Sequence, residues 1–304
     1  MTNNINNMLN KHDLNPVKYT IKNNVTIVDT DKGRVVFKKK KNDNGNNVNN
    51  LYNYLTSRSF NFYPKLINND NRNDYDMYEY IEEIDTPDEQ KALDIINLIS
   101  LLHNKTTYYK EANEDTYKEI YEKTKEKLNY LYNYYNDLII IAERSIYMSP
   151  KEYLFARNVS KIFSCIAFCN IELDKWLEDV KNNKKQRVVT LHNNLTLDHL
   201  IRNKDPYLIS WDKSKKDIPI YDFYNFYRNH YLDLDFNDLF DEYNSKYPLL
   251  DEEKKLLLIL LSIPPKIEFI DNELESCKTI RKQLDYIYKT EELVKEFYNL
   301  KTAN

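Results

Sequence analysis

The chain has 304 residues but only two glycines, Gly33 and Gly45. Glycine-rich phosphate loops depend on residues without side chains, because the backbone N–H groups must come close to the phosphate oxygens. Two isolated glycines cannot form such a loop. The sequence therefore argues against any site in which a glycine-rich loop covers a nucleotide.

Cysteine is also scarce, and Cys165, Cys169 and Cys277 form neither a disulfide framework nor a CxxC metal pair. The longest strongly apolar run, LLLILLSI, is well below the ~18 residues of a membrane span. The N-terminus has no apolar signal region. We expect a cytoplasmic protein without a membrane partner.

The net charge of −4 leaves no excess of basic residues. The one basic run, Lys38–Lys41, is bounded by acidic and amide residues. A nucleic-acid partner is therefore not expected. Hydrophobic residues at 41% and charged residues at 30% are ordinary for a globular protein, and the length allows one large domain or two lobes that share a cleft.

Short alternating runs dominate the N-terminal part of the chain. The runs KYTI, VTIVDT and RVVFKKK predict three antiparallel strands joined by tight turns. Val48–Arg58 has helical spacing and is expected to form a helix. Residues 1–16 are polar and rich in asparagine, and we expect a flexible N-terminus there.

Helical patterns take over after Thr86. Capping boxes at Thr86–Glu89 and Ser149–Glu152 open two long helices, and further helical stretches cover Asp115–Glu143 and Asn272–Leu300. The main interruption is a predicted hairpin whose turn is Asn203–Pro206. Strands followed by helices predict an α+β fold.

The central stretch Thr190–Asp222 carries the most informative motif. RVVTL leads into His192, a polar loop follows, and the runs HLIR and YLISW flank the hairpin turn. This stretch resembles the catalytic core of aminoglycoside phosphotransferases, choline kinases and bacterial spore-coat proteins of CotS type, whose pattern is H-G-D-x-x-x-x-N, a hairpin, then I-D-W. Here the frame reads H-N-N-L-T-L-D-H, then I-S-W.

The resemblance extends from about Val17 to Leu300 through the order of elements. It implies a bilobal protein-kinase-like fold, with a small N-terminal antiparallel sheet lobe and a large helical C-terminal lobe. In this frame Phe62–Ile67 and Tyr75–Glu83 resemble the last two strands of the small lobe and its hinge. The expected division is a flexible segment at 1–16, the N-terminal lobe at 17–84 and the C-terminal lobe at 85–304.

The resemblance also assigns roles to residues that have lost the matching chemistry. Asn194 stands at the position of the catalytic Asp, and an amide neither accepts a proton at neutral pH nor supplies negative charge. His199 stands at the metal-ligand Asn and Ser210 at the metal-ligand Asp, although magnesium prefers charged or carbonyl oxygen. His192 matches the structural histidine that begins the loop.

The N-terminal lobe shows similar departures. Lys38 is the nearest match to the nucleotide-binding lysine, with Lys39 one register away, and a solvated basic strand end is the alternative. The turn Lys22–Asn24 stands where the glycine-rich loop is expected, and it has no glycine. The helix within Val48–Arg58 has no Glu to pair with the lysine.

Two functions follow from this comparison. The first is a catalytically impaired pseudokinase that needs no cofactor and binds a protein or a small molecule, in a spore-coat-type role and with possible spore association. The second is an active phosphotransferase using ATP and Mg²⁺ with relocated carboxylates, Asp198 and Asp212. Asp212 follows Ser210 by two residues and so shares its side of an extended strand, but local backbone hydrogen bonding is the alternative role for both carboxylates. A metal site from His192 and His199 would lack the spacing of known sites.

Overall fold

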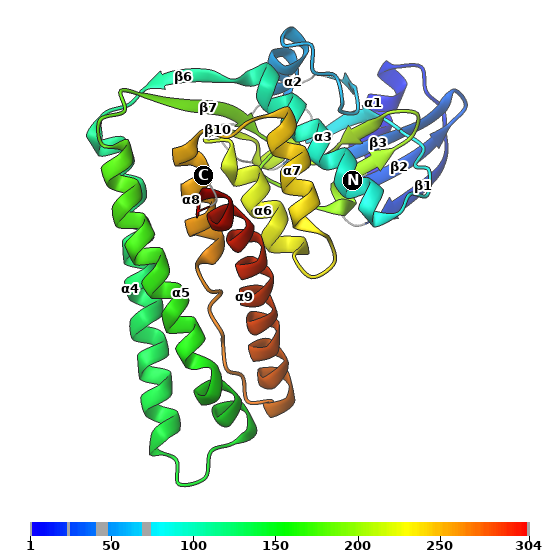
Figure 1. The fold of residues 1–304 in the computed structure, drawn as a ribbon. Coiled ribbons are helices and arrows are strands. Elements are labelled where there is room, and N and C mark those ends of the chain that lie inside the picture. Colours follow the sequence, from blue (N-terminus) through cyan, green and yellow to red (C-terminus); the bar gives the residue numbers. More distant parts are fainter. Residues whose placement is uncertain (1, 23–24, 41–47, 69–73, 303–304) are drawn as a thin grey trace. The chain divides into compact units, whose positions relative to one another are not determined.

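The computed structural model describes residues 2–22, 25–40, 48–68 and 74–302, and it has the expected α+β organisation (Figure 1). The chain forms two compact units. The first unit combines residues 1–106 with 192–215, and the second combines 107–191 with 216–304. The segment from His192 to Lys215 therefore groups with the N-terminal sheet, whereas our predicted domains part at 84/85. The domain limits stay a prediction.

The first unit contains the predicted five-stranded antiparallel sheet. Its strands are β1 (Pro16–Lys22), β2 (Val25–Thr30), β3 (Gly33–Lys39), β4 (Leu66–Asn68) and β5 (Tyr75–Glu79). They pair in the order β1-β2-β3-β5-β4. Gly33 closes the β2–β3 turn with φ of 128°, a conformation that favours glycine. The turn at Asn23–Asn24, where we expected the missing glycine-rich loop, lies outside the described residues, as do Lys41 and Gly45.

The sheet has one buried and one partly exposed face because side chains alternate along each strand. The fully buried face includes Val28, Val35, Phe37 and Met77. The other face places Val36 opposite Tyr78 and Lys38 opposite Asp76 across the β3–β5 pair. This second face carries the polar residues of the candidate site.

The N-terminal residues correct one expectation. Thr2–Lys11 forms helix α1, and Ile5, Met8 and Leu9 are at most 1% exposed within the same core cluster as the sheet. Their spacing places all three on one face of a helix. Burial of that face holds this segment in place, so the prediction of a flexible N-terminus is wrong for α1.

The other elements in the described part of the first unit are two helices and a hairpin. They are α2 (Val48–Ser57), α3 (Asp88–Thr106), β8 (Leu200–Arg202) and β9 (Pro206–Leu208). The hairpin has the predicted turn, with Leu200 opposite Leu208. Two single 3-10 turns, Leu197–His199 and Trp211–Lys213, flank it.

The second unit is mainly helical. Its helices are α4 (Glu114–Arg144), α5 (Pro150–Val180), α6 (Ile220–His230), α7 (Phe236–Lys246), α8 (Asp251–Ser262) and α9 (Glu273–Thr302). A three-stranded sheet joins β6 (Tyr108–Glu111), β7 (Lys185–Leu191) and β10 (Lys215–Asp217) in the order β10-β7-β6. No helix in the described ranges is long and apolar enough to cross a membrane.

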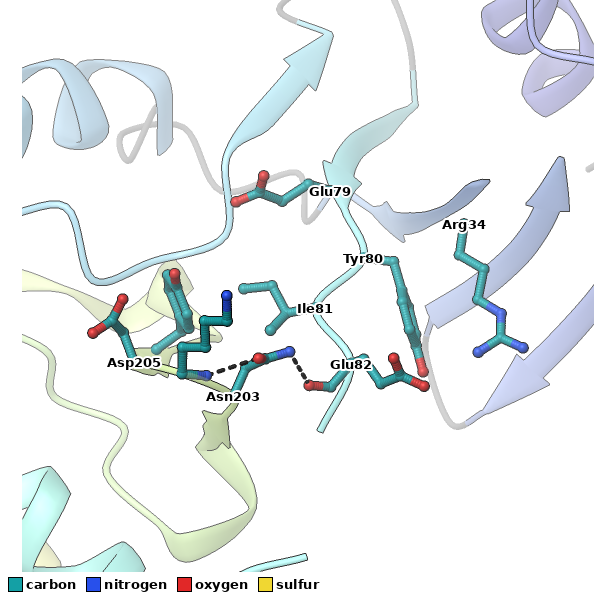
Figure 2. A pocket seen from close by; sticks show the side chains of 9 residues that line it. Arg34, Glu79, Tyr80, Ile81, Glu82, Asn203 and Asp205 are labelled. Atoms are coloured by element: carbon teal, nitrogen blue, oxygen red, sulfur yellow. Dashed lines mark hydrogen bonds between the residues drawn. The ribbon is translucent and has the colours of Figure 1, made fainter. Parts of the chain in front are cut away.

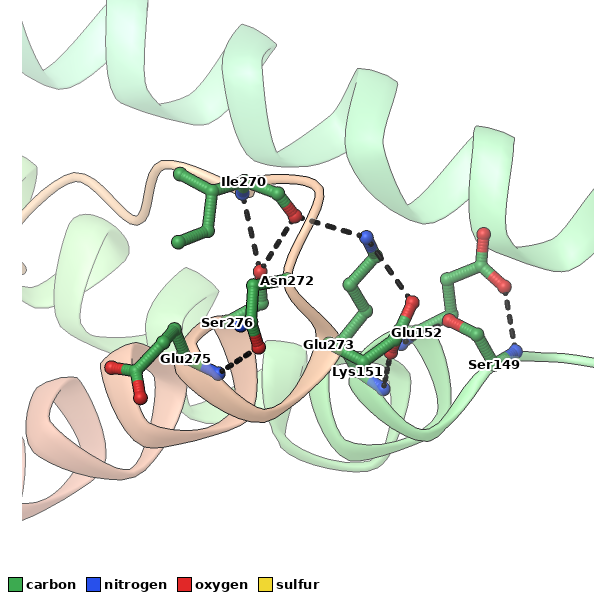
Figure 3. A network of polar contacts seen from close by, with 8 residues as sticks. All are labelled: Ser149, Lys151, Glu152, Ile270, Asn272, Glu273, Glu275 and Ser276. Carbon is green, nitrogen blue, oxygen red and sulfur yellow. Dashed lines mark hydrogen bonds and ion pairs between the residues drawn. The ribbon is translucent and has the colours of Figure 1, made fainter.

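The start of α5 shows how the long helices are fixed. The Ser149 side chain caps the helix by accepting a hydrogen bond from the Glu152 backbone N–H. The Glu152 carboxylate in turn accepts from the Ser149 N–H, which completes the capping box that the sequence predicted. Lys151 Nζ lies 3.2 Å from Glu273 Oε1 and donates to the Ile270 carbonyl at 3.2 Å (Figure 3). These bonds join the first turn of α5 to the first turn of α9.

Candidate functional site

His192 begins the polar loop and is completely buried. Its Nε2 atom lies 2.9 Å from the Ile209 carbonyl oxygen, and its ring packs edge-on against Trp211 with centroids 4.6 Å apart. The Trp211 indole N–H in turn donates to the Leu208 carbonyl at 2.8 Å. His192 therefore joins the start of the loop to the strand end that carries the I-S-W sequence.

Asn194, His199 and Ser210 lie together, although they come from separate parts of the loop and hairpin. Asn194 Nδ2 donates to the Ser210 carbonyl oxygen at 3.3 Å. His199 Nδ1 lies 2.6 Å from the Asn194 carbonyl oxygen. Ser210 adopts a left-handed backbone, with φ of 65° and ψ of 50°. Both hydrogen-bonding contacts end on a backbone oxygen, so the Asn194 and His199 side chains connect parts of the loop backbone.

Asn193 reinforces the same turn. Its φ is 57°, a left-handed conformation that asparagine tolerates better than most residues. Its side-chain amide donates to the Lys213 carbonyl at 3.0 Å. The neighbouring amides of Asn193 and Asn194 therefore both donate to carbonyl groups of the 209–214 segment, which keeps the two parts of the loop together without a carboxylate.

Lys38 and Asp212 form the most direct charged contact of this region. Lys38 Nζ lies 2.5 Å from Asp212 Oδ1, and the two side chains are 27% and 21% exposed. Lys39 projects from the opposite face of β3 and is exposed. Asp198 is exposed on the 3-10 turn Leu197–His199. Of the two proposed relocated carboxylates, only Asp212 lies beside the predicted lysine.

A second acidic residue, Asp76, extends this contact along β5. Asp76 faces Lys38 across the β3–β5 pair, and its Oδ1 lies 3.4 Å from Lys40 Nζ. Burial raises the pKa of the Asp76 carboxyl, while Lys40 and a hydrogen bond to Tyr78 act in the opposite direction. Burial also raises the pKa of Tyr78, and the negative charges of Asp76 and Asp212 add to that rise.

Helix α2 contributes a phenol to the same cluster. Burial raises the pKa of Tyr52 well above its ordinary value, and Tyr78, Asp76 and Asp212 contribute in the same direction. Tyr63 stacks on the Tyr52 ring at a centroid distance of 4.1 Å and donates to the Tyr52 carbonyl at 3.0 Å. In kinases the corresponding helix carries a Glu that pairs with the lysine. Here α2 instead places Tyr52 near Asp76 and Asp212, and the partner of Lys38 is Asp212.

The sequence reasoning missed Asp76, Tyr78 and Tyr52. A usable signal was present in YDMYE, where Asp76 and Tyr78 alternate with the apolar Tyr75 and Met77 and must share the second face of the sheet. Tyr52 had no such signal, because its neighbours in space come from β5 and from the 211–213 turn. The position of Tyr52 therefore depends on contacts between segments that are distant in the sequence.

These residues do not fit a magnesium ion. Within the described residues, no three His, Cys, Asp or Glu side chains lie close enough to hold a metal. In nucleotide sites magnesium is held by one or two carboxylates together with phosphate oxygens and waters, but here Asp212 and Asp76 each lie beside a lysine that competes for the carboxylate. His192 and His199 have ring centroids 6.5 Å apart, and each ring contacts a different backbone carbonyl.

A cavity of about 480 Å³ lies beside the segment that follows β5 (Figure 2). Its lining residues are Arg34, Glu79, Tyr80, Ile81, Glu82, Asn203, Lys204, Asp205 and Tyr207. Asn203 Nδ2 donates to the Glu82 carbonyl at 2.7 Å, and Ile84 N–H donates to the Arg202 carbonyl at 2.8 Å. The segment and the hairpin turn thus form two connected walls that carry aromatic rings and charges of both signs.

Comparison with solved structures shows the fold. An aminoglycoside phosphotransferase from Alicyclobacillus acidocaldarius matches with a TM-score of 0.68 at 10% identity over 93% of each chain. The AMP-bound spectinomycin phosphotransferase APH(9)-Ia matches with a TM-score of 0.54 at 12% identity over 90% of this chain and 93% of the other. No protein-family model and no curated protein matches the sequence. The chain has the protein-kinase-like fold of these phosphotransferases, as the sequence predicted.

Proposed function

We propose that this protein is a pseudokinase, a phosphotransferase-fold protein that binds a partner or a small molecule without transferring phosphate. One observation carries the proposal. Asn194, at the position of the catalytic base, donates its amide to the Ser210 carbonyl, while Ser210 stands at a metal-ligand position. Neither side chain can accept a substrate proton as a base or neutralise a magnesium ion.

The Lys38–Asp212 contact supports the same proposal. In phosphotransferases the corresponding lysine meets nucleotide phosphates, but the Lys38 ammonium lies 2.5 Å from a carboxylate. A phosphate would have to share the ammonium with Asp212, and because Lys38 and Lys40 balance the charges of Asp212 and Asp76, the cluster offers no net positive charge to attract it. Weak nucleotide binding is the expected consequence.

The cavity beside the segment after β5 supplies a place for a small molecule. Tyr80 and Tyr207 offer aromatic surface, and Glu79, Glu82 and Asp205 add carboxylates. A site that only binds a small molecule needs a complementary shape and a few polar groups that orient the molecule. It does not need side chains placed for a chemical reaction. A spore-coat-type binding role is the specific form that the sequence resemblance suggests.

The proposal is tested by restoring the missing groups. The variant Asn194→Asp/His199→Asn/Ser210→Asp supplies two carboxylates and an amide oxygen where the loop brings these positions together. Calorimetry should detect magnesium binding to the variant and none to the wild type. Turnover with ATP should stay slow, because positioning supplies most of the catalysis in phosphoryl transfer.

A matched control adds the same charges elsewhere. Asn133→Asp/Ser160→Asp introduces two carboxylates on exposed positions of α4 and α5, and it should bind magnesium no better than the wild type. Equal heats for the repaired variant, the control and the wild type would mean that the three loop positions do not form a metal site. Rapid ATP-dependent turnover by the wild type would overturn the pseudokinase proposal.

A second candidate, an active phosphotransferase, is favoured by the position of Asp212. Its carboxylate lies beside the predicted nucleotide-binding lysine, which is where a relocated metal ligand would be useful. In that case the wild type should consume ATP in a magnesium-dependent way, and Asp212→Asn should abolish turnover. Asp198→Asn, at an exposed position, serves as the comparison.

A further inference from the structure

Strand β1 is one edge of the five-stranded sheet, because it stands at the end of the strand order and, among the described residues, pairs with β2 alone (Figure 1). Alternate residues of such a strand direct their N–H and C=O groups away from the sheet. A further extended segment can bind these groups through backbone hydrogen bonds. β1 has seven residues, which is long enough for several such bonds.

One side chain of β1 packs against the core of the first unit, whereas its two large apolar neighbours are exposed to solvent. Tyr19 packs against the core cluster, and its hydroxyl donates to Asn6 of α1. In contrast, Val17 and Ile21 are 76% and 68% exposed. Val17 lies at a register shift between Pro16 and Lys18. Two large apolar side chains on a fixed backbone edge offer area that a bound strand could cover.

The charge of the edge is basic. Lys18 and Lys22 are exposed and project from the face opposite to Tyr19. Asp29 stands opposite Lys18 in register, but its carboxylate accepts from Arg34 Nε at 2.7 Å. Neither lysine forms an ion pair with another residue in the described part of the chain. An acidic ligand would neutralise both positive charges.

We propose that β1 binds an extended acidic segment of a partner protein by strand addition to the sheet. Backbone hydrogen bonds would align the segment, its carboxylates would meet Lys18 and Lys22, and its apolar side chains would cover Ile21 and Val17. A second copy of β1 is a poor occupant, because lysines would face lysines across the pair. This interaction is independent of the proposed pseudokinase function, since an active enzyme could use the same edge.

The test uses a fluorescent seven-residue peptide of alternating valine and glutamate, with a valine–lysine peptide as the charge-reversed probe. Anisotropy with the full chain should show binding of the glutamate peptide that weakens as salt rises. Lys18→Glu/Lys22→Glu should weaken this binding at least about tenfold, which corresponds to about 1.4 kcal/mol. Lys161→Glu/Lys184→Glu, at exposed positions outside the sheet, should leave it unchanged.

Hydrogen exchange distinguishes strand addition from loose electrostatic attraction. The glutamate peptide should slow exchange of backbone amides in β1, and Ile21→Ser should reduce both the affinity and this protection. Absence of binding, equal binding of the two peptides, or unchanged affinity in the lysine variant would overturn the proposal. It would also fail if sedimentation showed a dimer that Lys18→Glu/Lys22→Glu disrupts, because β1 would then be a self-interface.

Discussion

Lys38 and Asp212 are 174 positions apart in the sequence, yet Lys38 Nζ lies 2.5 Å from Asp212 Oδ1. The contact joins the third strand of the sheet to the turn after the I-S-W sequence, within the first unit. It also gives the lysine an acidic partner in place of the glutamate that α2 lacks. The free energy of this contact and its effect on ligand binding can be measured separately.

Removing either partner should lower the free energy of unfolding. Both side chains are mostly buried, so Lys38→Met and Asp212→Asn should each cost about 1–3 kcal/mol. The double variant should cost less than the sum, because the second change removes a group that the first left without its partner. Urea denaturation of all four proteins gives the coupling energy.

The exposed pair Lys123–Glu119 on α4 is a matched control, since its N–O distance is also 2.5 Å while its side chains are 73% and 66% exposed. Its coupling should be much smaller, because solvent screens the attraction between two exposed side chains. Additive effects of Lys38→Met and Asp212→Asn would contradict the account of this contact.

The raised pKa of Asp76 predicts a specific pH dependence. A carboxyl whose folded pKa exceeds its unfolded value, about 3.9, stabilises the fold below the unfolded value and loses that contribution as pH rises through the folded pKa. The difference in unfolding free energy between wild type and Asp76→Asn should therefore fall from about pH 4 upward and then level off.

Asp31 provides the opposite sign for comparison. Hydrogen bonds from the Asn15 backbone and side chain lower the pKa of Asp31. Its contribution should be present at neutral pH and be lost on acidification, so the difference between wild type and Asp31→Asn should rise with pH. If the stability differences for Asp76→Asn and Asp31→Asn changed with pH in the same direction, burial would not set the pKa of Asp76.

Helix α1 should contribute strongly to stability. Leu9 is completely buried beside the sheet, so Leu9→Ala should lower the unfolding free energy by about 2–5 kcal/mol. Leu274→Ala, at a side chain that is 64% exposed, should change it by less than about 0.5 kcal/mol. Similar midpoints for the two variants in chemical denaturation would mean that α1 does not pack as described.

The sequence predicted the elements whose signals are local. Alternation identified the first three strands of the sheet, the family resemblance supplied the last two, and the capping box at Ser149 marked the start of α5. The flexible N-terminus was a wrong prediction, although Ile5, Met8 and Leu9 have helical spacing. The polar composition of residues 1–16 favoured a flexible segment, but the burial of these three apolar side chains is enough to hold the helix against the sheet.

The candidate site was predictable only in part. The motif frame placed Asn194, His199 and Ser210 in one loop and hairpin, and hydrogen bonds to backbone oxygens connect these three residues. Their roles stay a prediction. The pairing of Lys38 with Asp212 could not be read from the sequence, since it depends on how the 211–213 turn packs beneath the sheet. The acids and phenols around it, Asp76 and Tyr52 among them, likewise depend on contacts between distant segments.

The most direct test of the impaired phosphate site is a thermal-shift titration of the wild-type protein with ATP, with and without magnesium. A ligand at about 100 times its dissociation constant stabilises a protein by ~2.7 kcal/mol, which such an assay readily detects. Our account predicts no magnesium-dependent rise in melting temperature, because Lys38 is paired with Asp212 and the ligand positions lack charge. A clear magnesium-dependent rise would contradict it, and loss of that rise in Asp212→Asn would assign the metal contact to Asp212.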